Sequence, residues 1–359
     1  MLKKMNKTTK NNLITYAMVI LAFVIMQILI SAGSISSLLQ GLMVPLCTYI
    51  ILAVSLNLVV GILGELSLGH AGFMCVGAFT SAFFSKCTRD VIASDGLRFF
   101  LALLIGIVTA AIFGMLIGIP VLRLKGDYLA IVTLAFGEII KNLVNVLYIG
   151  KDSQGLHFSM KDSIALNLDA DGTVILNGPQ GITGTPKNST FVIGFILILL
   201  TLFIVQNLIN SRDGRAIMAI RDNRIAAESI GINITKYKLM AFTISAAMAG
   251  AAGVLYAHNI STLTANTNNF GYNMSITILV FVVLGGIGNI RGSIIAAVIL
   301  TLLPELLRGM KDYRMLIYAI VLIVMMLFNW SPKAIEWREK LNDWRKKHFS
   351  FGKKAKEVE

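Results

Sequence analysis

Residues 11–64 read NNLITYAMVILAFVIMQILISAGSISSLLQGLMVPLCTYIILAVSLNLVVGILG and contain no Asp, Glu, Lys or Arg. Residues 239–290 are equally free of these four residue types. One bilayer crossing needs about 20 apolar residues, so each stretch has room for two crossings joined by a polar turn. No soluble core requires uncharged runs of this length, and the chain is therefore predicted to be an integral membrane protein.

Composition and charge agree with this prediction. Of the 359 residues, 56% are hydrophobic and only 14% are charged, whereas soluble domains have about 25% charged residues. The net charge of +13 comes from basic residues in short segments beside apolar runs, which is typical of cytoplasmic loops rather than of nucleic-acid binding. The first run, 13–32, is longer than the core of a secretory signal and is predicted to be the first transmembrane helix. We expect a multi-pass protein of the cell membrane.

Apolar runs and polar breaks predict an all-α fold with about ten transmembrane helices and both termini in the cytoplasm. The stretch 275–303 is either one tilted helix with Arg291 at its middle or two short segments hinged at 285–292. Two segments are preferred because they keep Arg291 at the cytoplasmic face and the basic tail inside. The predicted crossings are 13–32, 38–63, 67–85, 99–122, 128–149, 189–209, 239–257, the two segments within 275–303, and 315–330.

This topology divides the chain into a cytoplasmic N-terminal segment (1–12), a transmembrane domain (13–330) and a basic cytoplasmic tail (331–359). Residues 150–188, with three lysines and four aspartates, are predicted to form an external loop. Residues 210–238 hold six basic and three acidic residues. Burying nine charges would cost on the order of 20–30 kcal/mol at ~2.5–3.5 kcal/mol each, so this segment is predicted to be a cytoplasmic loop.

Signatures of catalysis are missing from the sequence. It has no G-x-x-x-x-G-K-[ST] phosphate loop, its four histidines lack metal-ligand spacing, and it has no serine nucleophile elbow. The sequence therefore predicts no catalytic residue, metal or cofactor, and transport is the favoured class of function. A stand-alone secondary transporter or channel would need charged groups along its helices, and only Glu65, His70 and Glu138 qualify. A membrane-embedded enzyme is the least supported class.

Two glycine-rich breaks are the candidate translocation path or hinge. Residues 61–72 combine four glycines with a carboxylate and an imidazole. A broken helix there would leave backbone groups free to meet a solute or another helix, and the alternative is a tight cytoplasmic turn with Glu65 and His70 wetted at its rim. The candidate residues are Gly64, Glu65, Ser67, Gly69, His70 and Gly72 in the first break, and Gly285, Gly286 and Gly288 in the second.

Glu138 is a further candidate because it lies near the middle of the fifth predicted crossing. Lys141 is one helical turn away on the same face. Since an unpaired carboxylate in a bilayer is costly, pairing or facing the helix bundle is favoured over a proton relay.

The predicted cytoplasmic loop has features that a solvated loop does not need. Residues 211–232 contain apolar residues at helical spacing and the small pair Ala226-Ala227. An exposed helix of this kind suits docking onto another protein. A helical loop at the lipid headgroups is the alternative.

Several motifs resemble one transporter family. Ala226-Ala227 with Gly231 matches the core of the Glu-Ala-Ala-x-x-x-Gly loop of ATP-binding cassette importer permeases, with Ile225 in place of the leading Glu. Four further segments match in order and spacing: Gly69-His70-Ala71, 122–131, 178–182 and 283–288. Over roughly residues 45–330 the chain resembles branched-chain amino acid permeases of the LivM type.

The resemblance implies an importer for branched-chain amino acids in which this chain pairs with a second, related permease. Two cytoplasmic ATPases and an external binding protein would complete it, and ATP hydrolysis would occur on the separate ATPase subunits. The implied ATPase-coupling residues are Arg215, Arg221, Asp222, Ala226, Ala227 and Gly231. A permease of the same superfamily for urea, a sugar or a nucleoside is the alternative, because the apolar pattern itself selects no solute.

Overall fold

The computed structural model describes residues 7–33, 36–124, 126–153, 155–170, 172–307, 309 and 313–330. The chain forms two compact units, Met1–Val298 and Ile299–Glu359, and each is described by itself. The predicted basic tail, 331–359, lies outside the described residues, as do residues 1–6 of the predicted N-terminal segment.

Helices dominate both units. The long helices of the first unit are α1 (Lys7–Ser31), α2 (Ser37–Asn57), α3 (His70–Cys87), α4 (Asp95–Val121), α5 (Asp127–Val146), α6 (Phe191–Asn210), α9 (Ile234–Ala257) and α11 (Tyr272–Gly285). Its shorter turns and helices are η2 (Leu58–Leu63), η3 (Ile164–Leu166), η4 (Gly178–Gln180), α7 (Arg212–Asp222), α8 (Arg224–Ser229) and α10 (Thr267–Phe270). The division between the units falls within α12 (Ile290–Leu306), and α13 (Arg314–Trp330) belongs to the second unit.

Seven helical segments among the described residues are long and apolar enough to cross a membrane. They are α1, α2 with η2, α4, α5, α6, α9 and the joined α10–α11. The other long helices, α3, α12 and α13, coincide with predicted crossings but do not reach the same combination of length and hydropathy. The helical membrane fold is therefore confirmed, whereas the count of ten crossings stays a prediction.

The ambiguous stretch 275–303 is split in two. Helix α11 ends at Gly285 and α12 begins at Ile290. Gly286 and Gly288 in the connecting turn have φ angles of +93° and +81°, a region that only glycine adopts readily. The Gly-Gly-Ile-Gly sequence thus ends one helix and lets the next begin, as the two-segment prediction requires.

Burial separates central from peripheral helices in the first unit. Of the membrane-length stretch in each segment, 94% is buried in α2–η2 but only 11% in α1. Large apolar side chains such as Leu21, Phe100 and Leu116 lie exposed on α1 and α4. Exposed apolar faces of this extent suit contact with lipid.

Small residues let the helices around α9 approach closely. An added Cβ at Gly77 of α3 would collide with the Gly250 carbonyl of α9, and one at Gly250 would collide with Ala110 of α4. Gly114 of α4 is blocked in the same way by Ala246. Because lipid provides no hydrophobic drive between helices, such small-residue contacts are a main source of packing energy in membranes.

The predicted external loop is folded rather than irregular. Strand β1 (Tyr148–Lys151) pairs antiparallel with β2 (Leu156–Ser159) and β3 (Thr173–Asn177), and β4 (Ile182–Thr183) pairs with β5 (Thr262–Leu263). The fifth crossing was predicted to reach residue 149, and this is wrong because α5 ends at Val146 and Tyr148 and Ile149 belong to β1. Lys86 anchors β3 by donating to the Val174 and Ile175 carbonyls at 3.0 and 3.3 Å.

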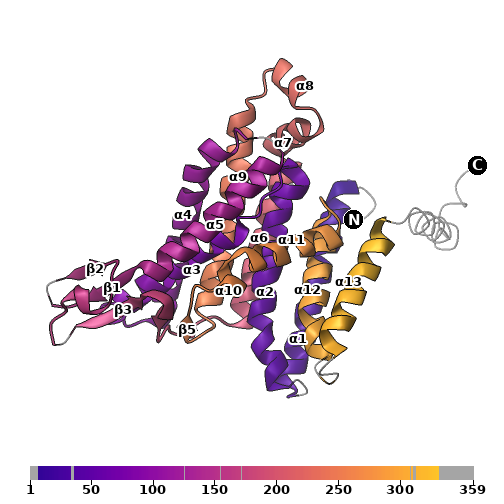
Figure 1. Cartoon of the computed structure of the whole chain (residues 1–359). Helices are drawn as coiled ribbons and strands as arrows, with labels where there is room; N and C mark the ends of the chain where they lie inside the picture. The colour runs from indigo at the N-terminus through magenta and orange to yellow at the C-terminus, as the bar shows by residue number, and fades with distance from the viewer. Residues whose placement is uncertain are drawn as a thin grey trace, which may run out of the picture. The chain divides into compact units, whose positions relative to one another are not determined.

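The sheet and the α7–α8 pair lie at opposite ends of the first unit's helices (Figure 1). This separation matches a loop on one side of the membrane and a charged loop on the other.

Replacing Gly250 with leucine should lower the free energy of unfolding by about 1–3 kcal/mol, the usual cost of overpacking a tight core. The measurement is the thermal unfolding midpoint of the full chain in detergent. Gly41→Leu is the matched control, because Gly41 is also helical but has no neighbour within 4 Å of an added Cβ. Equal midpoints for the two variants would contradict the packing role of Gly250.

Candidate functional site

The first glycine-rich break is an interrupted helix. The π-helical turn η2 ends at Leu63 and is followed by Gly64, which has a φ angle of +79°. Residues 64–69 run without helix until α3 begins at His70. Side chains of other helices take up the freed amides. The Thr133 hydroxyl of α5 accepts from the Leu68 amide at 3.0 Å, and the Ser275 hydroxyl of α11 accepts from the Ala71 amide at 3.2 Å.

His70 lies inside the protein. Its Nε2 atom lies 2.6 Å from the hydroxyl oxygen of Ser55 in α2 and shares a hydrogen bond with it. His70 is only 2% exposed. The alternative of an imidazole wetted at a cytoplasmic rim is therefore wrong for His70. Ser245 of α9 donates to the Ser55 carbonyl at 2.6 Å, so this cluster ties α2, α3 and α9 together.

Glu65 forms an ion pair with Lys238 at the start of α9. The two side chains are 15% and 5% exposed. The pair holds the interrupted segment against α9. Lys238 was not singled out from the sequence, because the two residues are 173 positions apart and neither position predicts the other.

Gly69, Gly72 and Ser67 fill out this segment. An added Cβ at Gly69 would collide with the Thr133 carbonyl, and one at Gly72 would lie 2.7 Å from the Cα of Gly137. The glycines thus permit close contact between α3 and α5. The buried Ser67 hydroxyl has no hydrogen-bond partner in the part of the chain that the structure describes.

The second break packs directly on the first. The Oδ1 atom of Asn57, at the end of α2, accepts from the Gly288 amide at 2.9 Å, and its Nδ2 atom donates to the Ser293 hydroxyl at 2.9 Å. An added Cβ at Gly61 would collide with the Gly288 backbone. Gly285 similarly has no room for a side chain against Ser293 of α12.

The predicted coupling loop consists of two helices, each started by a polar cap. Ser211 accepts from the Gly214 amide and Asn223 from the Ala226 amide, both at 3.0 Å. Such caps satisfy amides that have no partner at a helix start. Ser211 and Asn223 are therefore the local signals that divide residues 210–231 into α7 and α8.

The surface of α8 is partly apolar. Ala227 is buried against Ile220 and Ile234, whereas Ile225 and Ile230 are 81% and 75% exposed. Arg215, Asp222 and Ala226 are also exposed. Gly231 follows α8 with a φ angle of +84°.

Arg221 joins the coupling loop to the first break. Its Nη1 atom donates to the Gly61 carbonyl at 3.0 Å, and its Nε and Nη2 atoms donate to Asp222 at 3.0 and 2.9 Å. An added Cβ at Gly64 would lie 2.5 Å from the Cγ atom of Arg221. The structure thus brings together three segments that are far apart in sequence: 61–64, 221–222 and 285–293.

Glu138 belongs to a different cluster. Its predicted pair with Lys141 is confirmed, with 2.5 Å between Oε2 and Nζ. Its Oε1 atom accepts from the Tyr272 amide at 2.8 Å, and Asn145 donates to the Ala265 carbonyl at 2.9 Å. One face of α5 therefore holds the segment that precedes α11.

Asn57 and Lys238 are the residues that sequence reasoning missed. Asn57 ends a helix in a charge-free and mostly apolar stretch, and a buried carboxamide there needs hydrogen-bond partners. That signal was available from the sequence, although its partners were not.

Residues 37–328 match the family described as "Branched-chain amino acid transport system / permease component". The chain is 36% identical over 338 residues to the high-affinity branched-chain amino acid transport system permease protein LivM of Salmonella typhimurium. The matched region covers 91% of this chain and 75% of that relative. The chain is 25% identical over 258 residues to the corresponding LivH protein of Escherichia coli, covering 70% and 79%. The nucleoside ABC transporter permease protein NupC of Lactococcus lactis is 25% identical over 202 residues, covering 55% and 60%. No solved structure matches the chain.

Replacing Lys238 with methionine should leave the Glu65 carboxylate, which is only 15% exposed, without its partner and destabilise the protein by about 3 kcal/mol. The thermal unfolding midpoint in detergent measures this. The double variant Glu65→Gln with Lys238→Met should recover most of the loss, because no uncompensated charge remains. Equal losses for the single and double variants would show that the ion pair is not the cause.

Proposed function

The chain belongs to the family of permease components of branched-chain amino acid transport systems, and from this premise we propose how its residues operate in an importer. It is a membrane-embedded permease subunit of an ATP-binding cassette transporter for branched-chain amino acids. The chemistry of nucleotide hydrolysis is assigned to separate ATPase subunits.

The proposed assembly has two permeases, two cytoplasmic ATPases and an external binding protein. Relatives named LivM and LivH both match the chain, which favours a pair of related but different permeases. The folded segment 148–183 is the surface proposed to face the binding protein, since it lies at the opposite end from α7–α8 (Figure 1).

The proposed topology has ten crossings with both termini in the cytoplasm. Residues 13–330 form the permease domain, 150–188 the external loop and 210–238 the coupling loop, flanked by cytoplasmic segments 1–12 and 331–359. The break between α11 and α12 supports this count because it divides one long apolar stretch into two helices, one for each proposed crossing. It also leaves Arg291 near the start of α12 rather than at mid-helix.

The ATPase is proposed to dock on α7–α8. Ile225 and Ile230 are largely exposed on a segment that also exposes Arg215, Asp222 and Ala226. Large apolar side chains in a charged cytoplasmic loop would be covered in a complex.

One contact carries the proposal for coupling: the hydrogen bond from Arg221 to the Gly61 carbonyl. Movement of α7 on ATPase closure would pull on η2 through this bond and through the contact of Arg221 with Gly64. Because Gly61 lies against Gly288 and Asn57 binds the Gly288 amide, the displacement would reach the turn between α11 and α12. Access to the path would then switch by bending at Gly285, Gly286 and Gly288.

The path itself is proposed to run beside the interrupted segment 64–72. The Ser67 hydroxyl, which has no partner among the residues that the structure describes, is a group that a polar solute could satisfy, whereas Gly69 and Gly72 serve close packing. His70 and Glu65 position the segment rather than contact solute, since each has a partner inside the protein. Glu138 is proposed to hold α11 in the same manner.

The assembled transporter should take up labelled leucine only with ATP, and excess unlabelled isoleucine should compete, whereas urea and ribose should not. The measurement is uptake into proteoliposomes that contain the chain with its partner subunits. Uptake at full rate by this chain alone, without nucleotide, would overturn the importer assignment.

Replacing Arg221 with alanine should reduce leucine uptake roughly tenfold, the equivalent of ~1.4 kcal/mol, which matches a lost hydrogen bond from a charged group. Abundance in the membrane and binding of the ATPase should be unchanged, because the contact faces the permease. Arg212→Ala is the matched control, as Arg212 is an exposed arginine at the start of the same helix. Equal uptake by the two variants would contradict the relay.

Replacing Gly231 with leucine should abolish uptake while leaving the protein in the membrane. The cause is the left-handed backbone at this position, which costs a side-chain-bearing residue about 1–2 kcal/mol and would distort the end of α8. Gly231→Asn is the matched variant because asparagine tolerates this conformation better, and it should retain most uptake. Normal uptake by the leucine variant would count against the docking role of α8.

A further inference from the structure

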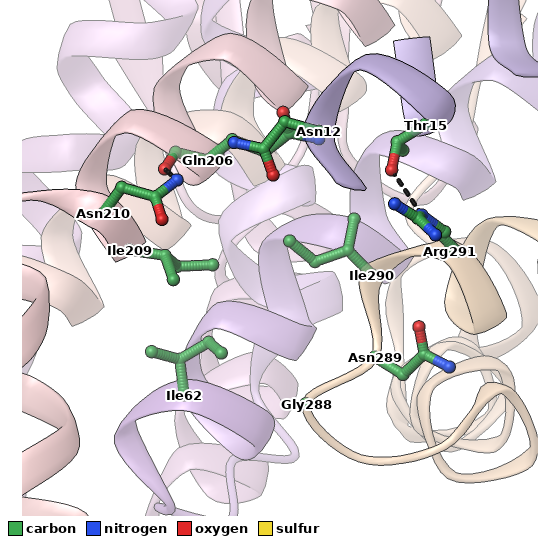
Figure 2. Close-up of a pocket in the computed structure, with 10 residues that line it drawn as sticks. All are labelled: Asn12, Thr15, Ile62, Gln206, Ile209, Asn210, Gly288, Asn289, Ile290 and Arg291. Atoms are coloured by element: carbon green, nitrogen blue, oxygen red, sulfur yellow. Dashed lines mark hydrogen bonds between the residues drawn. The ribbon is translucent and has the colours of Figure 1, made fainter. Parts of the chain in front are cut away.

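A cavity of about 280 Å³ with both polar and apolar lining lies in the first unit between α1, η2, α6 and the start of α12 (Figure 2). Six polar side chains line it: Asn12, Thr15, Gln206, Asn210, Asn289 and Arg291. The importer function described above assigns no role to this cavity.

The cavity lies at the ends of the helices that line it, where their apolar runs give way to polar or charged residues. Asn12 immediately precedes the apolar run of the first crossing, and Asn210 ends α6 just before the charged coupling loop. In the proposed topology both ends face the cytoplasm. The cavity is thus at the depth of the lipid headgroups.

The charge of the cavity favours an anion. Among the described residues that line it, Arg291 is basic and none is acidic. Arg291 is the second residue of the 17-residue helix α12, and a helix N-terminus adds partial positive charge. Thr15 accepts from the Arg291 Nε atom at 2.6 Å (Figure 2), which fixes the guanidinium at the cavity wall.

A second, independent observation points to a ligand that also donates hydrogen bonds. Gln206 lines the cavity and is only 5% exposed, yet its Oε1 atom has no partner among the described residues. A buried acceptor without a hydrogen-bond partner is energetically unfavourable, because it has lost its bonds to water. A ligand hydroxyl donating to this oxygen would remove that cost, while the carboxamides of Asn12, Asn210 and Asn289 can both donate and accept.

We propose that this cavity binds the headgroup of an anionic phospholipid whose phosphate lies at Arg291 and whose headgroup hydroxyl donates to Gln206. Phosphatidylglycerol has this chemistry. Basic pockets between transmembrane helices on the cytoplasmic side suit anionic headgroups. A lipid is favoured over a soluble phosphate because Leu13 and Ile14, between two lining residues of α1, are exposed apolar side chains that acyl chains can cover.

The bound headgroup also touches the parts proposed to move. Ile62 of η2 and Gly288 of the α11–α12 turn line the same cavity. The lipid would therefore brace the two breaks against each other. This consequence for uptake rests on the proposed function, whereas binding itself does not.

The test is native mass spectrometry of the full-length chain released from nanodiscs that contain equal amounts of phosphatidylglycerol and phosphatidylcholine. Wild type should retain phosphatidylglycerol in preference to phosphatidylcholine. Arg291→Gln should lower this retention about fivefold, the equivalent of ~1 kcal/mol for one basic residue near an anionic headgroup. Arg291→Lys should keep most of it.

Two controls keep the result interpretable if Arg291→Gln folds poorly. Gln206→Leu removes the Oε1 acceptor without changing charge and should lower retention of phosphatidylglycerol several-fold. Arg123→Gln removes one positive charge from the exposed connection between α4 and α5, outside the cavity, and should leave retention unchanged.

Equal retention of the two lipids by wild type would overturn the proposal, as would wild-type retention by both Arg291→Gln and Gln206→Leu. A soluble source is tested with sn-glycerol 3-phosphate added to the detergent-solubilised chain. A rise in unfolding temperature equal to that given by phosphatidylglycerol would overturn the assignment to a lipid. Failure of these tests would leave leucine uptake untouched, so it is distinguishable from failure of the importer function.

Discussion

The structure depends on satisfying backbone groups where helices are broken inside a membrane protein. Lipid offers no hydrogen bonds, so each freed amide or carbonyl must find a partner within the protein. In the first unit, residues 64–69 and 286–289 leave the helical pattern. Thr133 and Ser275 take up amides at the first break, and Asn57 takes up the Gly288 amide at the second.

These partners come from helices that are distant in sequence. The two breaks are therefore the positions at which several helices contact one another. Asn57 alone links α2 to the turn at Gly288 and to Ser293 of α12. Arg221 adds the coupling loop by binding the Gly61 carbonyl. A carbonyl freed from regular α-helical pairing is thus the point at which the charged helix α7 contacts the interrupted helix.

The sequence predicts the helices well because their determinants are local. Charge-free runs locate the crossings, and Gly285-Gly286-Ile287-Gly288 locates the break between α11 and α12. The pair of Glu138 with Lys141 is predictable for the same reason, since three residues separate the two on one helix face. The family was likewise predictable from the sequence, because several short motifs occur in the expected order along the chain.

What the sequence could not provide is contact between distant segments. The partner of Glu65 is 173 residues away and that of Asn57 is 231 residues away, and no periodicity relates them. The strands between Tyr148 and Thr183 were missed because their pairing, including the link of β4 to β5, depends on where α5 and α9 end in space. Short strands of two to five residues also leave little alternation to detect.

The contacts among α3, α4 and α9 differ from those of the turn between α11 and α12 in the free energy needed to separate them. Helices α3, α4 and α9 meet through small residues whose backbones touch, as at Gly77 with Gly250 and Gly250 with Ala110, so separation would open voids along whole helix faces. The turn at Gly286 and Gly288 packs on Gly61 and is held by the Asn57 hydrogen bond, but it is short and has backbone angles that glycine alone adopts freely. Bending at this turn breaks fewer contacts than sliding α9 against its neighbours. Displacement of α7 would therefore be taken up between η2 and α12 while the α3–α4–α9 group stays intact.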